Sequence, residues 1–129
     1  MSTINAHNVF GEPLLPCCIE PATGFTRDGY CRHSPYDRGK HLLCARVTES
    51  FLEFSLRQGN DLITPRPQYQ FPGLKPGDRW CLCVDRWLEA LKAEIAPPLF
   101  LARCHHAVLS TIPLDTLLRH AVTEESPHP

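Results

Sequence analysis

One short stretch, Trp80–Ala90 (WCLCVDRWLEA), constrains the fold more than any other part of the chain. Residues 80–84 form an unbroken apolar run, which is typical of a strand buried on both faces. Asp85 can accept hydrogen bonds from the N–H groups of a helix first turn. Apolar residues then recur at helical spacing, at Trp87, Leu88, Leu91 and Ile95. The stretch therefore predicts a central strand that leads directly into a packing helix.

A second strand and helix are predicted earlier in the chain. Residues 42–47 (LLCARV) have the composition of a strand, and a helix is expected at about 49–58. Either Thr48 or Ser50 can cap the start of this helix, the latter as part of a capping box. Gly59 is expected to end it, because glycine readily adopts the left-handed conformation found after a helix.

The last part of the chain is expected to repeat this alternation. Leu99–Arg103 is a third strand candidate, residues 104–109 can form one helical turn, and Pro113 is expected to open a last helix. The order predicts an α+β fold, a two-layer α/β sandwich in which a small mixed sheet carries about three helices mainly on one face. At 129 residues the chain is expected to be a single domain, with an ordered core over about 8–121 and a flexible tail over 122–129.

Charge and hydropathy limit the partners. Lys plus Arg is 13 and Asp plus Glu is 14, so the formal charge is −1 and no nucleic-acid partner is expected. The N-terminus resembles no signal peptide, and no apolar run approaches the roughly 18 residues of a membrane span. We expect a cytoplasmic protein without a membrane partner, in which the seven cysteines are mostly reduced. A homo-oligomer is left open.

The long loop over residues 60–79 is rich in proline. Uninterrupted loops of this length are often functional. The favoured interpretation is a rigid wrap, because the prolines stiffen the loop and apolar residues are spaced along it like anchors. These anchors are Leu62, Phe71 and Leu74.

The cysteines allow three interpretations. Buried structural thiols are favoured, because free cysteine packs as a small hydrophobic residue. A metal site is the second interpretation. Cys81 and Cys83 are two residues apart in a strand, so their side chains point to the same face, with Cα atoms about 6.6 Å apart. Two thiolates on one face can bind zinc or another soft divalent metal. The candidate ligands are Cys31, His41, Cys44, Cys81, Cys83 and His105, with Cys17 as a further candidate. A redox or nucleophilic cysteine is the third, and it requires a thiolate beside a base.

Polar residues flank the junction between the loop and the second helix. They are Asn60, Asp61, Arg79, Asp85, Arg86 and Glu89. An arginine and carboxylates at the end of a strand can hold a small polar ligand. The alternative is purely structural, with Asp85 as a helix cap and an ion pair between loop and helix. The motifs GxGxxG, GxxxxGK[ST], HExxH and GxSxG are absent, so nucleotide binding and α/β-hydrolase chemistry have no support.

Several blocks resemble one family. GNDLITPRPQYQFPGLKPGDRWCLCVDRWLEA is similar to the signature of domain-of-unknown-function family 2237, a group of small, mainly bacterial proteins. NVFGEPLLPC, TGFTRDGYC, HLLCARVTESFLEFS and APPLFLARCH resemble its other blocks, so the likeness covers about residues 8–121. The resemblance implies a two-layer α/β sandwich and names no catalytic residue. It implies threonine where this chain has Cys104, which disfavours Cys104 as a nucleophile.

Together these features predict a single-domain protein that binds a small ligand or a metal, or acts as an accessory protein. Its polar pocket is expected at the 60–79 loop and the 80–87 strand–helix junction. The alternative is a thiol-dependent enzyme or redox protein that uses Cys81, Cys83 or Cys31. Whether the protein is an enzyme is left open by the sequence. The positions of the sulfur atoms distinguish these hypotheses.

Overall fold

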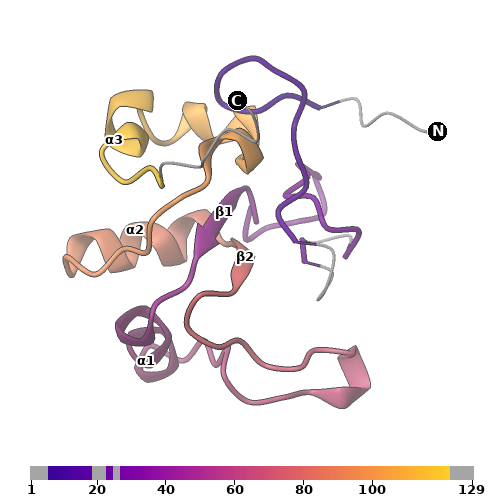
Figure 1. The fold of residues 1–129 in the computed structure, drawn as a ribbon, viewed down its shortest axis with the longest axis vertical. Coiled ribbons are helices and arrows are strands. Elements are labelled where there is room, and N and C mark those ends of the chain that lie inside the picture. Colours follow the sequence, from indigo (N-terminus) through magenta and orange to yellow (C-terminus); the bar gives the residue numbers. More distant parts are fainter. Residues whose placement is uncertain (1–5, 19–22, 25–26, 123–129) are drawn as a thin grey trace.

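Two short strands form the sheet at the centre of the computed structural model, which describes residues 6–18, 23–24 and 27–122. β1 (Leu43–Arg46) pairs antiparallel with β2 (Arg79–Leu82), and the register sets Cys44 opposite Cys81. Most residues of both strands are buried, as the apolar runs predicted. Of the described residues, three α-helices lie on one side of this sheet and the irregular segment before β1 lies on the other (Figure 1).

The first helix, α1 (Glu49–Arg57), has the predicted ends. The hydroxyl of Thr48 accepts a hydrogen bond from the backbone N–H of Phe51 at 3.1 Å, so Thr48 and not Ser50 is the cap. Gly59 has a φ of 90°, the left-handed conformation expected after the last turn. The last helix, α3 (Leu114–Leu118), follows Pro113 as predicted but is short.

The second helix, α2 (Val84–Lys92), begins earlier than the sequence indicated. Cys83 is the N-cap, with extended backbone angles of φ −61° and ψ 134°, and Asp85 lies within the first turn. The prediction that Asp85 caps this helix is therefore wrong. The apolar spacing is confirmed, because Trp87 is completely buried and its Nε1 donates to the carbonyl oxygen of Pro97 at 3.0 Å.

The prediction of a third strand at Leu99–Arg103 is also wrong. Leu99 forms isolated bridges to Ala45 and Ala121, and Leu101–Arg103 is a 3₁₀ helix. The prolines at 97 and 98 lack the N–H groups that a longer ladder with β1 needs, so pairing stops after a few hydrogen bonds. The described residues thus hold a two-stranded antiparallel sheet and three α-helices, which confirms the α+β class.

The 60–79 loop is anchored as the wrap interpretation predicted. Phe71 and Leu74 are buried, and Leu62 packs against the core while its carbonyl accepts from Leu74 N–H at 2.8 Å. Between the anchors, a 3₁₀ turn at Pro67–Tyr69 forms an exposed tip that projects away from the sheet in Figure 1.

Two expectations concern the ends of the chain and its partners. The predicted tail falls almost wholly on residues 123–129, which lie outside the described residues, and the single domain remains a prediction. The longest α-helices described, α1 and α2, have nine residues each, and none is long and apolar enough to cross a membrane.

Candidate functional site

A small pocket of about 210 Å³ opens where β2 passes into α2. It lies at the predicted place, between the start of the 60–79 loop and the strand–helix junction. Of the six polar residues that the sequence indicated, Asn60 and Arg86 line it. The complete lining is His41, Asn60, Leu62, Trp80, Cys81, Leu82, Cys83 and Arg86.

Cys83 brings a thiol to this pocket from the end of the strand. It is partly exposed and forms no disulfide, and as the N-cap of α2 its side chain makes no capping hydrogen bond. The N-terminal end of a helix carries partial positive charge, which stabilises an anion such as a thiolate.

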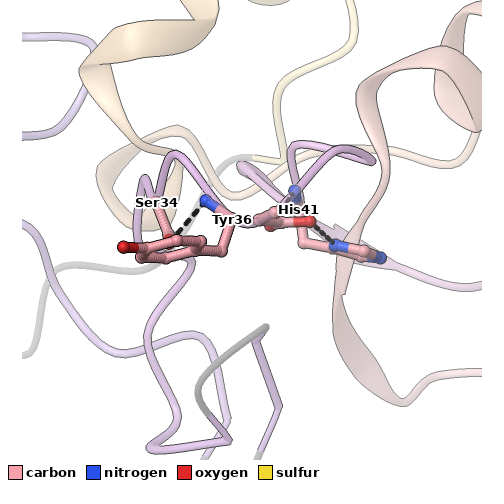
Figure 2. A network of polar contacts seen from close by, with 4 residues as sticks. Ser34, Tyr36 and His41 are labelled. Atoms are coloured by element: carbon pink, nitrogen blue, oxygen red, sulfur yellow. Dashed lines mark hydrogen bonds and ion pairs between the residues drawn. The ribbon is translucent and has the colours of Figure 1, made fainter.

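His41 reaches the same pocket from the turn before β1. Its Nδ1 donates to Asp37 Oδ1 at 2.8 Å, and its backbone N–H donates to Asp37 Oδ2 at 2.9 Å (Figure 2). The Asp37 side chain is only 2% exposed, whereas that of His41 is 37% exposed. A carboxylate bonded to Nδ1 fixes the tautomer that leaves Nε2 able to accept a proton.

The turn that carries His41 is held directly against the start of α2. The backbone N–H of Val84, next to Cys83, donates to the carbonyl oxygens of Gly39 at 3.3 Å and Lys40 at 3.1 Å. Lys40 has a φ of 53°, a left-handed conformation that costs a non-glycine residue about 1–3 kcal/mol. Strained turns of this kind cluster at sites where side chains must be positioned.

The space around Gly39 locates the histidine ring relative to the thiol. A β-carbon on Gly39 would stand 2.9 Å from Cε1 of His41 and 3.4 Å from Sγ of Cys83. The ring and the sulfur thus face a common point, and only glycine leaves that point unoccupied. His41 is thus hydrogen-bonded to Asp37, and His41 and Cys83 border the same space beside Gly39.

Arg86 supplies positive charge at the pocket. Its Nη1 donates to the carbonyl oxygen of Gln58 at 3.2 Å and to Glu89 Oε1 at 3.3 Å. The hydrogen bond to Gln58 ties α2 to the end of α1 and fixes the guanidinium. The guanidinium and the Cys83 thiol both belong to the pocket lining, and Glu89 partly balances the charge of Arg86.

The other predicted polar residues are engaged in local structure. Asp61 Oδ1 accepts from the N–H groups of Ile63 and Thr64, and hydrogen bonds from Thr64 hold the pKa of this carboxyl below its ordinary value. Arg79 stacks over the ring of Phe100 at 5.3 Å. Asp85 lies in the first turn of α2, and Glu89 pairs with Arg86. These contacts are structural but differ from the predicted alternative, because Asp85 is not the cap of α2 and the ion pair between Arg86 and Glu89 lies within that helix.

The structure divides the cysteines into two groups. Two disulfides, Cys17–Cys44 and Cys31–Cys81, join four of the seven, although the sequence predicted mostly reduced thiols. The pairing arises because Cys44 and Cys81 face each other across the ladder, and the loops before β1 bring a partner to each. The sulfur atoms of Cys17, Cys31 and Cys81 lie within 4.8 Å of one another.

The predicted metal ligands are accordingly spread over three places. Cys31, Cys44 and Cys81 belong to the disulfide group, to which Cys17 adds a fourth sulfur. His41 and Cys83 lie at the pocket. His105 is the N-cap of the 3₁₀ helix His106–Ser110, where its Nδ1 accepts from Ala107 N–H at 2.9 Å. Within the described part of the chain, the one group of three or more convergent ligands is Cys17, Cys31 and Cys81.

Sequence reasoning missed Asp37. It lies in a polar turn without hydrophobic periodicity, so no pattern of secondary structure singles it out. The available signal was its spacing, four residues before a histidine with a glycine between them, which lets a turn close one side chain onto the other.

A second cavity, of about 420 Å³, lies between α1 and residues 74–76. It is larger than the first, but its lining has no cysteine or histidine. The smaller pocket is therefore the better candidate for chemistry.

Comparison with known proteins now identifies the family. The sequence model of a family described as "Uncharacterized protein conserved in bacteria (DUF2237)" matches residues 7–121. The chain belongs to this family. The match includes every described helix and strand, all seven cysteines, and both Asp37 and His41. Among curated proteins, none matches the chain. The resemblance seen in the sequence is confirmed. The chain is a cysteine-rich member of a family whose description names no activity.

Proposed function

We propose that this protein is a thiol-dependent enzyme that binds a small polar ligand in the 210 Å³ pocket and uses Cys83 as its nucleophile. The observation that carries the proposal is the convergence of Cys83 Sγ and the ring of His41, itself held by buried Asp37, on the space beside Gly39. The proposal joins the polar pocket and the thiol chemistry that the sequence presented as alternatives.

Each side chain has a defined role in this reaction. His41 accepts the proton of the Cys83 thiol, and Asp37 keeps the imidazole in the required tautomer. Sγ then forms a bond to an electrophilic carbonyl carbon of the ligand, while the leaving group departs with the proton from His41. Water cleaves the resulting thioester and restores the thiol.

The pocket supports a narrow class of ligand. Sites for drug-sized ligands have volumes of about 300–1,000 Å³, so a pocket of 210 Å³ suits a smaller molecule. Arg86 and Asn60 favour one with a carboxylate or another anionic group. We further propose that the partner is this small molecule and not nucleic acid, and that the protein works in the cytoplasm, where the reducing environment keeps Cys83 as a thiol and also favours reduction of the two disulfides.

The test is the rate at which Cys83 reacts with iodoacetamide, followed by mass spectrometry of the digested protein. Replacement of His41 by Asn removes the base and should slow the reaction about 100-fold, within the usual range for general-base catalysis. His106→Asn is the matched control, because His106 is exposed and lies away from the pocket lining. Equal rates in wild type and His41→Asn would contradict thiol catalysis and leave a site that only binds.

A further inference from the structure

The two disulfides lie close enough together to form one buried centre. Cys44 and Cys81 are opposite each other in the ladder, and each is bonded to a cysteine from an irregular segment. The sulfur atoms of Cys17, Cys31 and Cys81 lie within 4.8 Å of one another, and all four cysteines are at most 1% exposed.

This spacing is close to that of a zinc–thiolate centre. A tetrahedral zinc ion with Zn–S bonds of about 2.3 Å holds its sulfur atoms about 3.8 Å apart. Three of the four sulfur atoms already lie within 4.8 Å of one another, and the fourth, that of Cys44, is bonded to that of Cys17. Reaching the zinc arrangement therefore requires breaking the S–S bonds and moving Cys44 Sγ toward the other three. Four cysteines and no water ligand are the usual donor set of a closed, structural zinc site.

The backbone around the cysteines is held by contacts that do not depend on the disulfides. Cys81 N–H donates to the hydroxyl of buried Thr23 at 2.8 Å, and Cys17 N–H donates to the carbonyl oxygen of Gly29 at 2.6 Å. The β-ladder fixes Cys44 relative to Cys81. Reduction therefore leaves these cysteines anchored near one another.

We infer that the four cysteines form a redox-dependent zinc site, with two disulfides when oxidised and one tetrathiolate-bound zinc ion when reduced. Each disulfide accepts two electrons and two protons. A dithiol reductant supplies both and becomes a disulfide, whereas a phosphine supplies the electrons and a water molecule supplies the protons and the oxygen of the phosphine oxide that forms. Zn²⁺ then replaces one thiol proton for each Zn–S bond formed. Oxidation of the four thiolates by a disulfide oxidant removes four electrons, re-forms both S–S bonds and releases the ion. This centre is independent of the reaction proposed for Cys83.

The test uses the full chain, with Zn²⁺ as the probe. The protein is reduced with a phosphine under anaerobic conditions, exchanged into Zn²⁺, desalted and analysed for metal content. One equivalent of zinc per reduced chain and none per oxidised chain is expected. Cys17→Ser should weaken zinc binding by more than about 100-fold, the upper end of the loss from removing a supporting group alone. Cys18→Ser and Cys83→Ser are the controls and should retain the full equivalent.

A second measurement keeps the inference testable if Cys17→Ser does not fold. Alkylation of the reduced wild-type protein should modify Cys17, Cys31, Cys44 and Cys81 in the absence of metal, and zinc should protect these four. Less than stoichiometric zinc in the reduced protein, or zinc that protects Cys83 in place of these four, would overturn the inference.

Discussion

Cys81 and Cys83 are separated by one residue and both border the 210 Å³ pocket, yet they differ in burial and in bonding. Cys81 is inside the ladder, 1% exposed and bonded to Cys31. Cys83 stands where β2 ends, partly exposed, without a disulfide, at the N-terminus of α2 and beside His41. The difference shows that residue type and spacing do not determine what a cysteine does. The end of a strand separates a cross-link that stabilises the fold from a thiol that faces a pocket.

The largest expected difference between the two cysteines is in stability. Removing the cross-link with Cys31→Ala and Cys81→Ala together should lower the free energy of unfolding of the oxidised protein by about 2–5 kcal/mol. Cys83→Ala should change it by less than about 1 kcal/mol, because the side chain is partly exposed and unbonded. Urea denaturation measures both. Equal losses would show that the two cysteines do not differ as described.

The next effect concerns the pocket alone. Asp37→Asn removes the carboxylate that orients His41 and should slow iodoacetamide modification of Cys83 by about tenfold, because the neutral amide no longer fixes the imidazole tautomer. The exposed Asp115 on α3 provides the control variant Asp115→Asn. An unchanged rate in a folded Asp37→Asn protein would mean that the buried carboxylate serves only the turn.

A smaller effect tests the charge at the pocket. Arg86→Gln should reduce the rate with iodoacetate relative to iodoacetamide by about fivefold, corresponding to roughly 1 kcal/mol for one charge near the surface. Arg57→Gln changes an exposed arginine near the end of α1 and should leave the ratio unaltered. If Arg86→Gln has the same ratio as wild type, Arg86 does not select an anionic ligand.

The smallest expected effect concerns His105, which lies outside the pocket lining and contributes to stability. Partial burial, followed by the nearby His33, His106 and His7, lowers the pKa of His105 below its ordinary value of 6.5. The unfolded chain therefore binds the proton more readily, so the contribution of neutral His105 to stability is present above about pH 6.5 and is lost as the pH falls below it. His105→Asn keeps a capping acceptor and should flatten this part of the pH–stability curve. If the stability of His105→Asn depends on pH in the same way as that of wild type, the lowered pKa of His105 does not contribute to stability.

Local chemistry made much of the fold predictable. The run from Trp80 to Trp87 indicated a buried strand followed by a packing helix, and Thr48, Gly59 and Pro113 mark helix ends for reasons that act within a few residues. The third strand was not predictable in this way. Residues 99–103 have the composition of a strand, but the two prolines before Leu99 limit the pairing of this segment with β1.

The place of the pocket was predictable, but most of its lining was not. The pocket lies at the indicated junction, with Asn60 and Arg86 in its lining. The contact of Asp37 with His41 and the disulfide between Cys17 and Cys44 both depend on turns and loops. These segments have no periodic pattern of apolar residues from which their path could be predicted. Cys17 and Cys44 are 27 residues apart, and only the path of the chain between them brings their sulfur atoms together.

One peptide tests the contrast between the two cysteines directly. Trypsin releases Trp80–Arg86, which contains both Cys81 and Cys83, and releases Cys31 in the peptide Asp28–Arg32. The protein, isolated without reductant, is treated briefly with iodoacetamide, digested without reduction and examined by mass spectrometry. We predict that Trp80–Arg86 carries one label, on Cys83, and is joined to Asp28–Arg32 through Cys81. Labelling of Cys81 as rapid as that of Cys83, or a disulfide formed by Cys83, would contradict the account.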